Sequence, residues 1–207
     1  EINVITDDNI NSFIEFPEYV SQKYKDGYIT RTHYSDLIRL ELLKQYGGIW
    51  IDATVLCESR TLIDNLFEGN TEFFVFKDPL ALDEYVAVSS WLMYAKAQNP
   101  YLKTVENMLL EYWKAENYLC NYFLLHIFIC IVAELKPDEW KKIPAYSCQP
   151  PHILQNELFD VYDKRRFNQL MEMSSIHKLS YKFAEEQFER NDTVYQHLKQ
   201  LYLDEKV

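Results

Sequence analysis

Among the charged side chains between Ile29 and Cys57, the types and positions of Asp36, Arg39 and Asp52 suit the binding of a ligand. Asp36 and Arg39 are three positions apart, which places them side by side on the surface of a helix. Most other positions nearby are Leu or Ile, and a helix that is apolar nearly all round is buried. Buried charges must be paired or must hold a ligand. Asp36 and Arg39 are therefore either a structural ion pair or part of a binding site.

The third charge, Asp52, follows an apolar strand predicted at 49–51. Ligands of open α/β sheets bind at the carboxyl ends of strands. The helix expected at 32–46 ends at Gly47-Gly48, because glycine adopts the left-handed conformation that terminates a helix. The alternative is that Asp52 is a solvated residue in a turn. The combination of helix, Gly-Gly, strand and Asp favours a site.

The run from Ser35 to Thr54 reads S-D-L-I-R-x-x-x-L-x-x-Y-G-G-I-W-I-D-A-T. It resembles the bacterial capsular polysaccharide synthesis glycosyltransferases, which are related to the DXD-containing sugar transferases that include yeast mannosyltransferases. The resemblance implies an α/β fold of the GT-A type, a mixed sheet flanked by helices. Relatives have another strand and helix before the point where this chain opens, so we expect that the first N-terminal strand and helix are missing.

The resemblance also implies roles for particular residues. The implied donor-binding residues are Ser35, Asp36, Arg39, Gly48, Asp52 and Lys178. Asp52 is the implied catalytic residue, which holds the sugar or a divalent cation (Mn²⁺ or Mg²⁺) that neutralises the diphosphate. The second acidic residue of the family's Asp-x-Asp is Thr54 here, so Asp52 is the only carboxylate of that pair.

Related transferases carry a His near their C-terminus that completes the metal site, and a nearby Lys beside the leaving diphosphate. His177 and Lys178 stand at that place here. Imidazole is a common metal ligand, and an ammonium group offsets the charge of a departing phosphate. The alternative is an exposed His-Lys pair in a loop.

Composition excludes several classes of protein. The chain carries 32 acidic and 21 basic residues, for a net charge of −11, so the basic surface of a nucleic-acid binder is missing. The most apolar segment, Leu119–Leu135, contains His126 and Glu134, which favours a buried helix over a membrane span. On such a helix, His126 is expected to be a core histidine with its hydrogen bonds satisfied. The four cysteines match no metal or disulfide pattern, which favours reduced thiols in the cytoplasm.

The remaining pattern predicts one domain over residues 1–207. Strands are expected at Ile2–Thr6, Glu72–Phe76 and Tyr85–Ser89, with Ser90-Trp91 following the last. Helices are expected at Asn9–Phe16, around Leu62–Phe67, from Asn99-Pro100 onward, in part of 152–173 and at Thr193–Leu203. Pro144–Pro151 is expected to be a loop that breaks at Pro150-Pro151, and Asp78-Pro79 to end a strand.

The function that the resemblance implies is transfer of a hexosyl group from a nucleoside diphosphate sugar to a carbohydrate acceptor. The acceptor would be a capsular or cell-surface polysaccharide, lipid-linked in its growing form, and the enzyme would work in the cytoplasm or at the inner face of the membrane. Two alternatives remain open: a non-catalytic sugar-binding or scaffold domain, and a structural protein whose Asp36–Arg39 pair only ties the core together. A cleft that joins Asp36, Arg39, Asp52 and His177 would favour the enzyme.

Overall fold

The structure is a computed structural model and describes residues 1–77 and 86–203. The chain forms two compact units that interleave along the sequence. The first unit comprises Glu1–Trp50 and Asn70–Tyr146, and the second comprises Ile51–Gly69 and Ser147–Val207. Helices and small sheets occur together, so the α/β fold class predicted from the sequence is confirmed.

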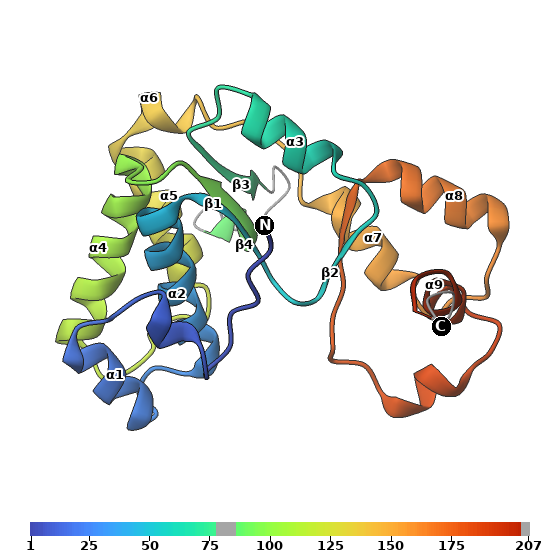
Figure 1. The fold of residues 1–207 in the computed structure, drawn as a ribbon, viewed down its shortest axis with the longest axis horizontal. Helices are drawn as coiled ribbons and strands as arrows, with labels where there is room; N and C mark the ends of the chain where they lie inside the picture. The colour runs from blue at the N-terminus through green and yellow to red at the C-terminus, as the bar shows by residue number, and fades with distance from the viewer. Residues whose placement is uncertain (78–85, 204–207) are drawn as a thin grey trace. The chain divides into compact units, whose positions relative to one another are not determined.

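The sheet of the first unit has the strand order β1 (Gly48–Ile51), β4 (Val88–Ala95) and β3 (Phe73–Lys77). β3 and β4 are antiparallel, and their register shifts at Val75/Phe76. Both strands are apolar and almost wholly buried, as expected for strands covered on both faces. In Figure 1 the helices of this unit stand beside the sheet.

The helices of the first unit supply most of its core. They are η1 (Ile10–Ser12), α1 (Glu18–Lys25), α2 (Arg31–Tyr46), α4 (Pro100–Ala115), α5 (Leu124–Leu135) and α6 (Pro137–Trp140). α4 packs against both α2 and α5, and α5 also packs against β4. Leu40 of α2, Trp113 of α4 and Ile129 of α5 are fully buried in one apolar cluster. This packing fixes the face of α2 that carries the charged pair.

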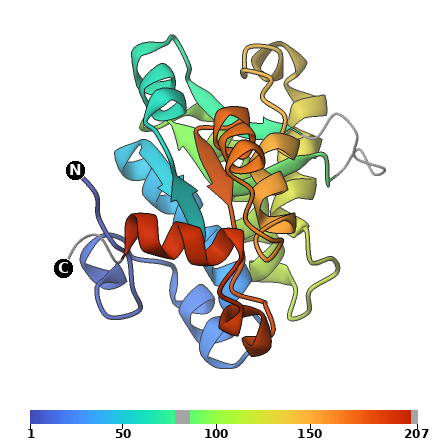
Figure 2. The same cartoon turned by 90° about the vertical axis from the view of Figure 1, so that its right-hand side faces the viewer.

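The second unit has a two-stranded antiparallel sheet of β2 (Val55–Cys57) and β5 (Ile176–Lys178). Its helices are α3 (Thr61–Glu68), α7 (Gln149–Asn156), α8 (Lys164–Met173), η3 (Glu185–Glu189) and α9 (Val194–Tyr202). A separate apolar cluster joins α7, α8 and α9 through Leu154, Phe167 and Leu198. Figure 2 shows α9, in red, beside the orange helices of this unit.

Local signals at helix ends are confirmed. The predicted end of α2 at Gly47 is confirmed, with φ 69°. Its start is set by Thr30, whose side chain accepts a hydrogen bond from the His33 amide and which was not predicted as a cap from the sequence. Asn99 caps α4 by accepting from the Leu102 amide, and Pro100 is its first residue. The predicted helical turn near Leu62, the strand near Phe73 and the terminal helix are confirmed as α3, β3 and α9.

Several other predictions are wrong. Residues 2–6 form no strand, and the side chains of Ile2 and Val4 are exposed. The helix expected at Asn9–Phe16 is only the short turn η1, although Ile14 beyond it is buried in the same core as Ile10. The strand expected to end at Ser89 runs from Val88 to Ala95, while Tyr85 and Asp78-Pro79 lie outside the described residues. Pro150 and Pro151 lie in the first turn of α7 rather than in a loop, since proline is tolerated there.

The apolar segment predicted at Leu119–Leu135 packs inside the first unit. The part from Leu124 onward is α5, and its Leu125, Ile129 and Val132 are fully buried. Within residues 1–77 and 86–203, no helix combines the length and apolar character that crossing a membrane requires.

Candidate functional site

Asp36 and Arg39 lie on α2, and both are buried, with 6% and 5% of their surface exposed. The burial predicted from the apolar surroundings is therefore confirmed. Arg39 Nη2 lies 3.2 Å from Asp36 Oδ1, one helical turn away. Water does not screen a pair at this depth, so its members depend strongly on each other.

A second element completes the surroundings of Arg39. Its Nη1 donates to the backbone oxygen of Ser90 at 2.6 Å and to the Ser90 hydroxyl at 2.8 Å. Trp50 of β1 lies with its ring centroid 5.3 Å from the guanidinium carbon. Strands β4 and β1 thus hold the guanidinium from the sheet side, while α2 holds it through Asp36. Ser90, which the sequence placed after a strand, is part of β4 and of this network.

The contacts between Arg39 and Ser35 are longer than its contacts with Asp36 and Ser90. Nε donates to the Ser35 backbone oxygen and Nη2 to the Ser35 hydroxyl, each at 3.4 Å. Hydrogen bonds of this length are weak compared with those at 2.6–2.8 Å. Ser35 therefore holds the guanidinium less tightly than Ser90 does. The guanidinium fork suits the oxygens of a phosphate.

Gly47 and Gly48 both have positive φ, 69° and 98°. A Cβ on Gly47 would lie 2.7 Å from the Ala97 amide nitrogen, so this glycine is required by space as well as by backbone conformation. A Cβ on Gly48 would meet nothing within 4 Å, so there only the conformation selects glycine. The role of Gly48 in donor binding stays a prediction.

His126 of α5 is a residue whose importance the sequence reading missed. The Nδ1 atom of His126 is buried and has no hydrogen-bond partner among the described residues, so the expectation of a satisfied core histidine is wrong. Burial, with a further contribution from the positive charge of Arg39, lowers the pKa of His126 to about 4. The signal available in the sequence was an ionisable residue in an apolar helix.

Asp52 belongs to the second unit and follows directly after β1, as predicted. Its backbone oxygen accepts from the Val55 amide at 3.2 Å, which closes a turn into β2. The side chain is half-buried. The predicted position of Asp52 at the end of the strand is confirmed, and its part in catalysis stays a prediction.

Lys178 lies next to the Asp52-Ala53-Thr54 turn because β5 pairs with β2. Its ammonium donates to the Thr54 hydroxyl and, at 2.9 Å, to the Leu179 backbone oxygen. The Leu179 amide in turn donates to the Thr54 backbone oxygen at 2.8 Å. The fold therefore places the ammonium of Lys178 beside Thr54, which occupies the position of the second acidic residue in the Asp-x-Asp pattern.

His177 is on β5 opposite Leu56 and is only 1% exposed. The alternative of an exposed His-Lys pair in a loop is therefore wrong, because strand pairing with a distant segment encloses the ring. Burial lowers the pKa of His177, and the backbone of Ser174 partly offsets this effect. The described residues contain no group of three or more His, Cys, Asp or Glu arranged to hold a metal. The metal-binding role predicted for His177 stays a prediction.

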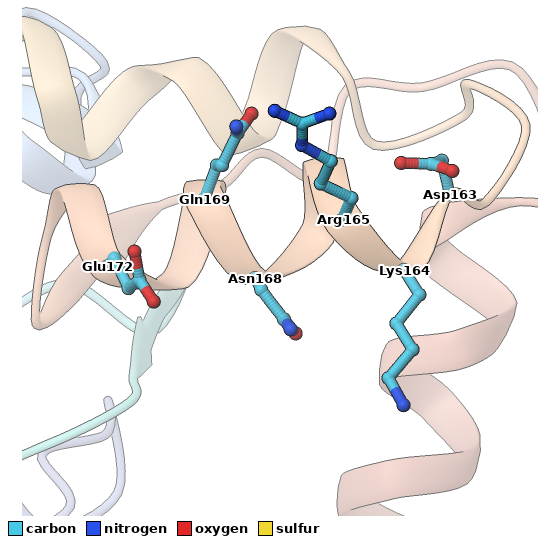
Figure 3. Close-up of a pocket in the computed structure, with 6 residues that line it drawn as sticks. All are labelled: Asp163, Lys164, Arg165, Asn168, Gln169 and Glu172. Atoms are coloured by element: carbon cyan, nitrogen blue, oxygen red, sulfur yellow. The ribbon is translucent and has the colours of Figure 1, made fainter.

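An open depression also occurs on the surface of α8 in the second unit. It is lined by Asp163, Lys164, Arg165, Asn168, Gln169 and Glu172. Figure 3 shows Arg165 and Gln169 pointing to one side of the helix and Lys164 and Asn168 to the other. Side chains that diverge in this way do not converge on a ligand, so we assign no function to this surface.

The protein is thus an α/β protein with a buried Asp36–Arg39 pair on one unit and, on the other, a turn at Asp52-Ala53-Thr54 whose Thr54 accepts a hydrogen bond from Lys178 of β5. Residues 1–198 match the capsular polysaccharide synthesis protein family, so the chain belongs to this family. A curated relative, the O-glycosyltransferase braB of Annulohypoxylon truncatum, is 44% identical over 48 residues. That match covers 22% of this chain and 11% of the relative, so the chain corresponds to only a small part of the relative's length. No solved structure matches.

Proposed function

We propose that this protein is a glycosyltransferase of the GT-A type that moves a hexosyl group from a nucleoside diphosphate sugar to a carbohydrate acceptor. The acceptor in this proposal is a capsular or cell-surface polysaccharide, lipid-linked while it grows. Membership of the capsular polysaccharide synthesis family and the partial match to an O-glycosyltransferase support a transferase. We further propose that it acts in the cytoplasm or at the inner face of the membrane.

The observation that carries the proposal is the buried network of Asp36, Arg39, Ser90 and Trp50. A guanidinium that is fixed on three sides and more weakly held next to Ser35 is preorganised for an anion on that side. Preorganised charge of this kind binds a diphosphate without the cost of ordering the side chain. In the proposal, Arg39 contacts the donor's phosphate, and Asp36 keeps the guanidinium in place.

The roles of Asp52 and Lys178, which lie on the second unit, are proposed from the resemblance of the sequence to the sugar transferases and not from their position relative to Arg39. Mg²⁺ and Mn²⁺ take oxygen ligands and are commonly bound by one or two carboxylates together with substrate phosphates. Asp52 fits such a cation as a single half-buried carboxylate, whereas His177 serves only if its ring leaves its buried place. The cation would neutralise the charge of the diphosphate. Lys178 would offset the charge of the departing nucleoside diphosphate.

A non-catalytic sugar-binding or scaffold domain is the second candidate. It is favoured by the loss of the second acidic residue at Thr54 and by the engagement of Arg39 with protein groups. Both candidates predict binding of a sugar nucleotide, and only the enzyme predicts its turnover.

The test is a screen for release of nucleoside diphosphate from a panel of nucleotide hexoses, with and without Mn²⁺ and in the presence of oligosaccharide acceptors. The matched variant is Ser35→Ala, which removes a hydroxyl held at only 3.4 Å and so leaves the fold intact. If Ser35 and Arg39 share a phosphate, the variant lowers turnover by about tenfold or more, the value of one hydrogen bond to a charged group. Binding without turnover by the wild-type protein would favour the scaffold domain.

A further inference from the structure

His126 is the third residue of α5, and its Nδ1, which has no hydrogen-bond partner in the described part of the chain, is costly to the folded protein. A buried polar atom without a hydrogen bond destabilises a protein by about 1–3 kcal/mol. A leucine or phenylalanine in this apolar helix would avoid that cost. The nitrogen is therefore expected to find its partner in a molecule that binds to the protein.

The surroundings of His126 indicate the chemistry of that partner. Burial and the charge of Arg39 hold the pKa at about 4, so the imidazole is neutral near pH 7, with one nitrogen as donor and the other as acceptor. An anion would be bound best by a protonated imidazole, which the charge of Arg39 opposes. A hydroxyl group both donates and accepts, so it satisfies Nδ1 in either tautomer.

Aromatic side chains border the same histidine. The Phe123 ring lies edge-on to the imidazole with centroids 5.4 Å apart, and Tyr122 lies edge-on to Phe123 at 5.2 Å. Both rings are exposed, with 43% of the Phe123 surface and 56% of the Tyr122 surface in contact with solvent. Aromatic rings beside a few well-placed polar atoms are typical of pockets for small organic ligands. A sugar ring offers both parts, a C–H face for the aromatic ring and hydroxyls at its edge.

We propose that Nδ1 of His126 hydrogen-bonds a hydroxyl of the hexosyl group of the donor, while Phe123 packs against the C–H face of that sugar. His126 is then a specificity-determining residue for the sugar rather than for the diphosphate. The residue is only half-buried, so a rotation of the imidazole, or a displacement of the exposed Phe123 ring, brings Nδ1 to the ligand. This inference rests on the proposed function, because it requires a sugar nucleotide as ligand.

The test compares each sugar nucleotide with its own nucleoside diphosphate. Binding of UDP-glucose, UDP-galactose and GDP-mannose, and of UDP and GDP alone, is measured by calorimetry. His126→Leu removes both ring nitrogens, and His126→Asn keeps a polar atom close to the place of Nδ1. We expect His126→Leu to weaken binding of the preferred sugar nucleotide by about 3- to 10-fold and to leave binding of the nucleoside diphosphate unchanged. His126→Asn should restore most of the loss.

A second readout separates this role from a structural one. Since His126→Leu removes an unsatisfied polar atom, its melting temperature should equal or exceed that of the wild type. Equal weakening of both ligand classes, or no weakening of the sugar nucleotide, would overturn the inference and leave the proposed function standing. Wild-type protein that binds no member of a full panel of nucleoside diphosphate hexoses would instead contradict the proposed function.

Discussion

Glu106 of α4 carries a buried carboxylate whose titration should be visible in the stability of the protein. It is 1% exposed, and its Oε2 lies 2.9 Å from the Lys44 ammonium. The same ammonium lies 2.6 Å from Glu41, so one positive charge serves two carboxylates. Burial raises the pKa of Glu106 to about 7, and the neighbouring Glu41 adds to this increase. The positive charge of Lys44 acts in the opposite direction but does not cancel it.

The sign of the effect follows from the raised pKa. Folded Glu106 binds a proton more tightly than unfolded Glu106, so its contribution to stability is fully present below about pH 4.5. This contribution is lost as the pH rises through about 7. A pKa that moves from 4.5 to about 7 corresponds to at most about 3 kcal/mol. Lys44 remains partly solvated, so we expect a loss of about 1–2 kcal/mol between about pH 5 and pH 8.

Urea unfolding of the wild type and of Glu106→Gln at these two pH values measures the effect. The glutamine cannot titrate, so the variant should lose about 1–2 kcal/mol less stability than the wild type as the pH rises. The control is Glu111→Gln on the same helix, because Glu111 is exposed and pairs with Lys114 at the surface. Wild type and Glu106→Gln with the same pH dependence would refute the reasoning.

Two further substitutions test the packing around the candidate site. Gly47→Ala places a Cβ 2.7 Å from the Ala97 amide and should cost about 2–4 kcal/mol in chemical unfolding, whereas Gly27→Ala, with φ 81° and open space, should cost about 1–2 kcal/mol. Equal costs would show that space at Gly47 is not limiting. Asp36→Ala leaves the charge of Arg39 buried without its carboxylate and should lower the free energy of unfolding by about 3–5 kcal/mol. Adding Arg39→Met to this variant should recover part of that loss. A double variant no more stable than Asp36→Ala would contradict the buried-pair interpretation.

Features that depend on neighbouring residues could be predicted from the sequence. The caps at Thr30, Asn99 and Gly47 each involve groups only a few positions apart, so the sequence carries the whole signal. The burial of Asp36 and Arg39 was also predictable, because their apolar neighbours share the same helix.

Features that depend on distant segments were not predictable. Residues 2–6 have the composition of a strand, but a strand requires a partner, and no segment within 1–77 and 86–203 pairs with them. The alternative of an exposed loop at His177 stayed open because the pairing of His177 with Leu56 joins segments far apart in the sequence. That His126 Nδ1 finds no partner among residues 1–77 and 86–203 depends on three-dimensional packing, which the spacing of residues in the sequence does not reveal.

Turnover by Asp52→Asn tests the central claim most directly. Asp52 is the only carboxylate that the Asp52-Ala53-Thr54 segment offers to a cation, so the substitution should lower release of nucleoside diphosphate by about a hundredfold or more. The shape of the side chain is kept at the end of a strand, so the melting temperature should change little. The control is Asp64→Asn, an exposed carboxylate of the same unit paired with Arg60, which should leave turnover unchanged. Equal turnover and equal melting of Asp52→Asn and wild type would show that Asp52 takes no part in catalysis. Turnover lost together with the folded state would assign it a structural role alone.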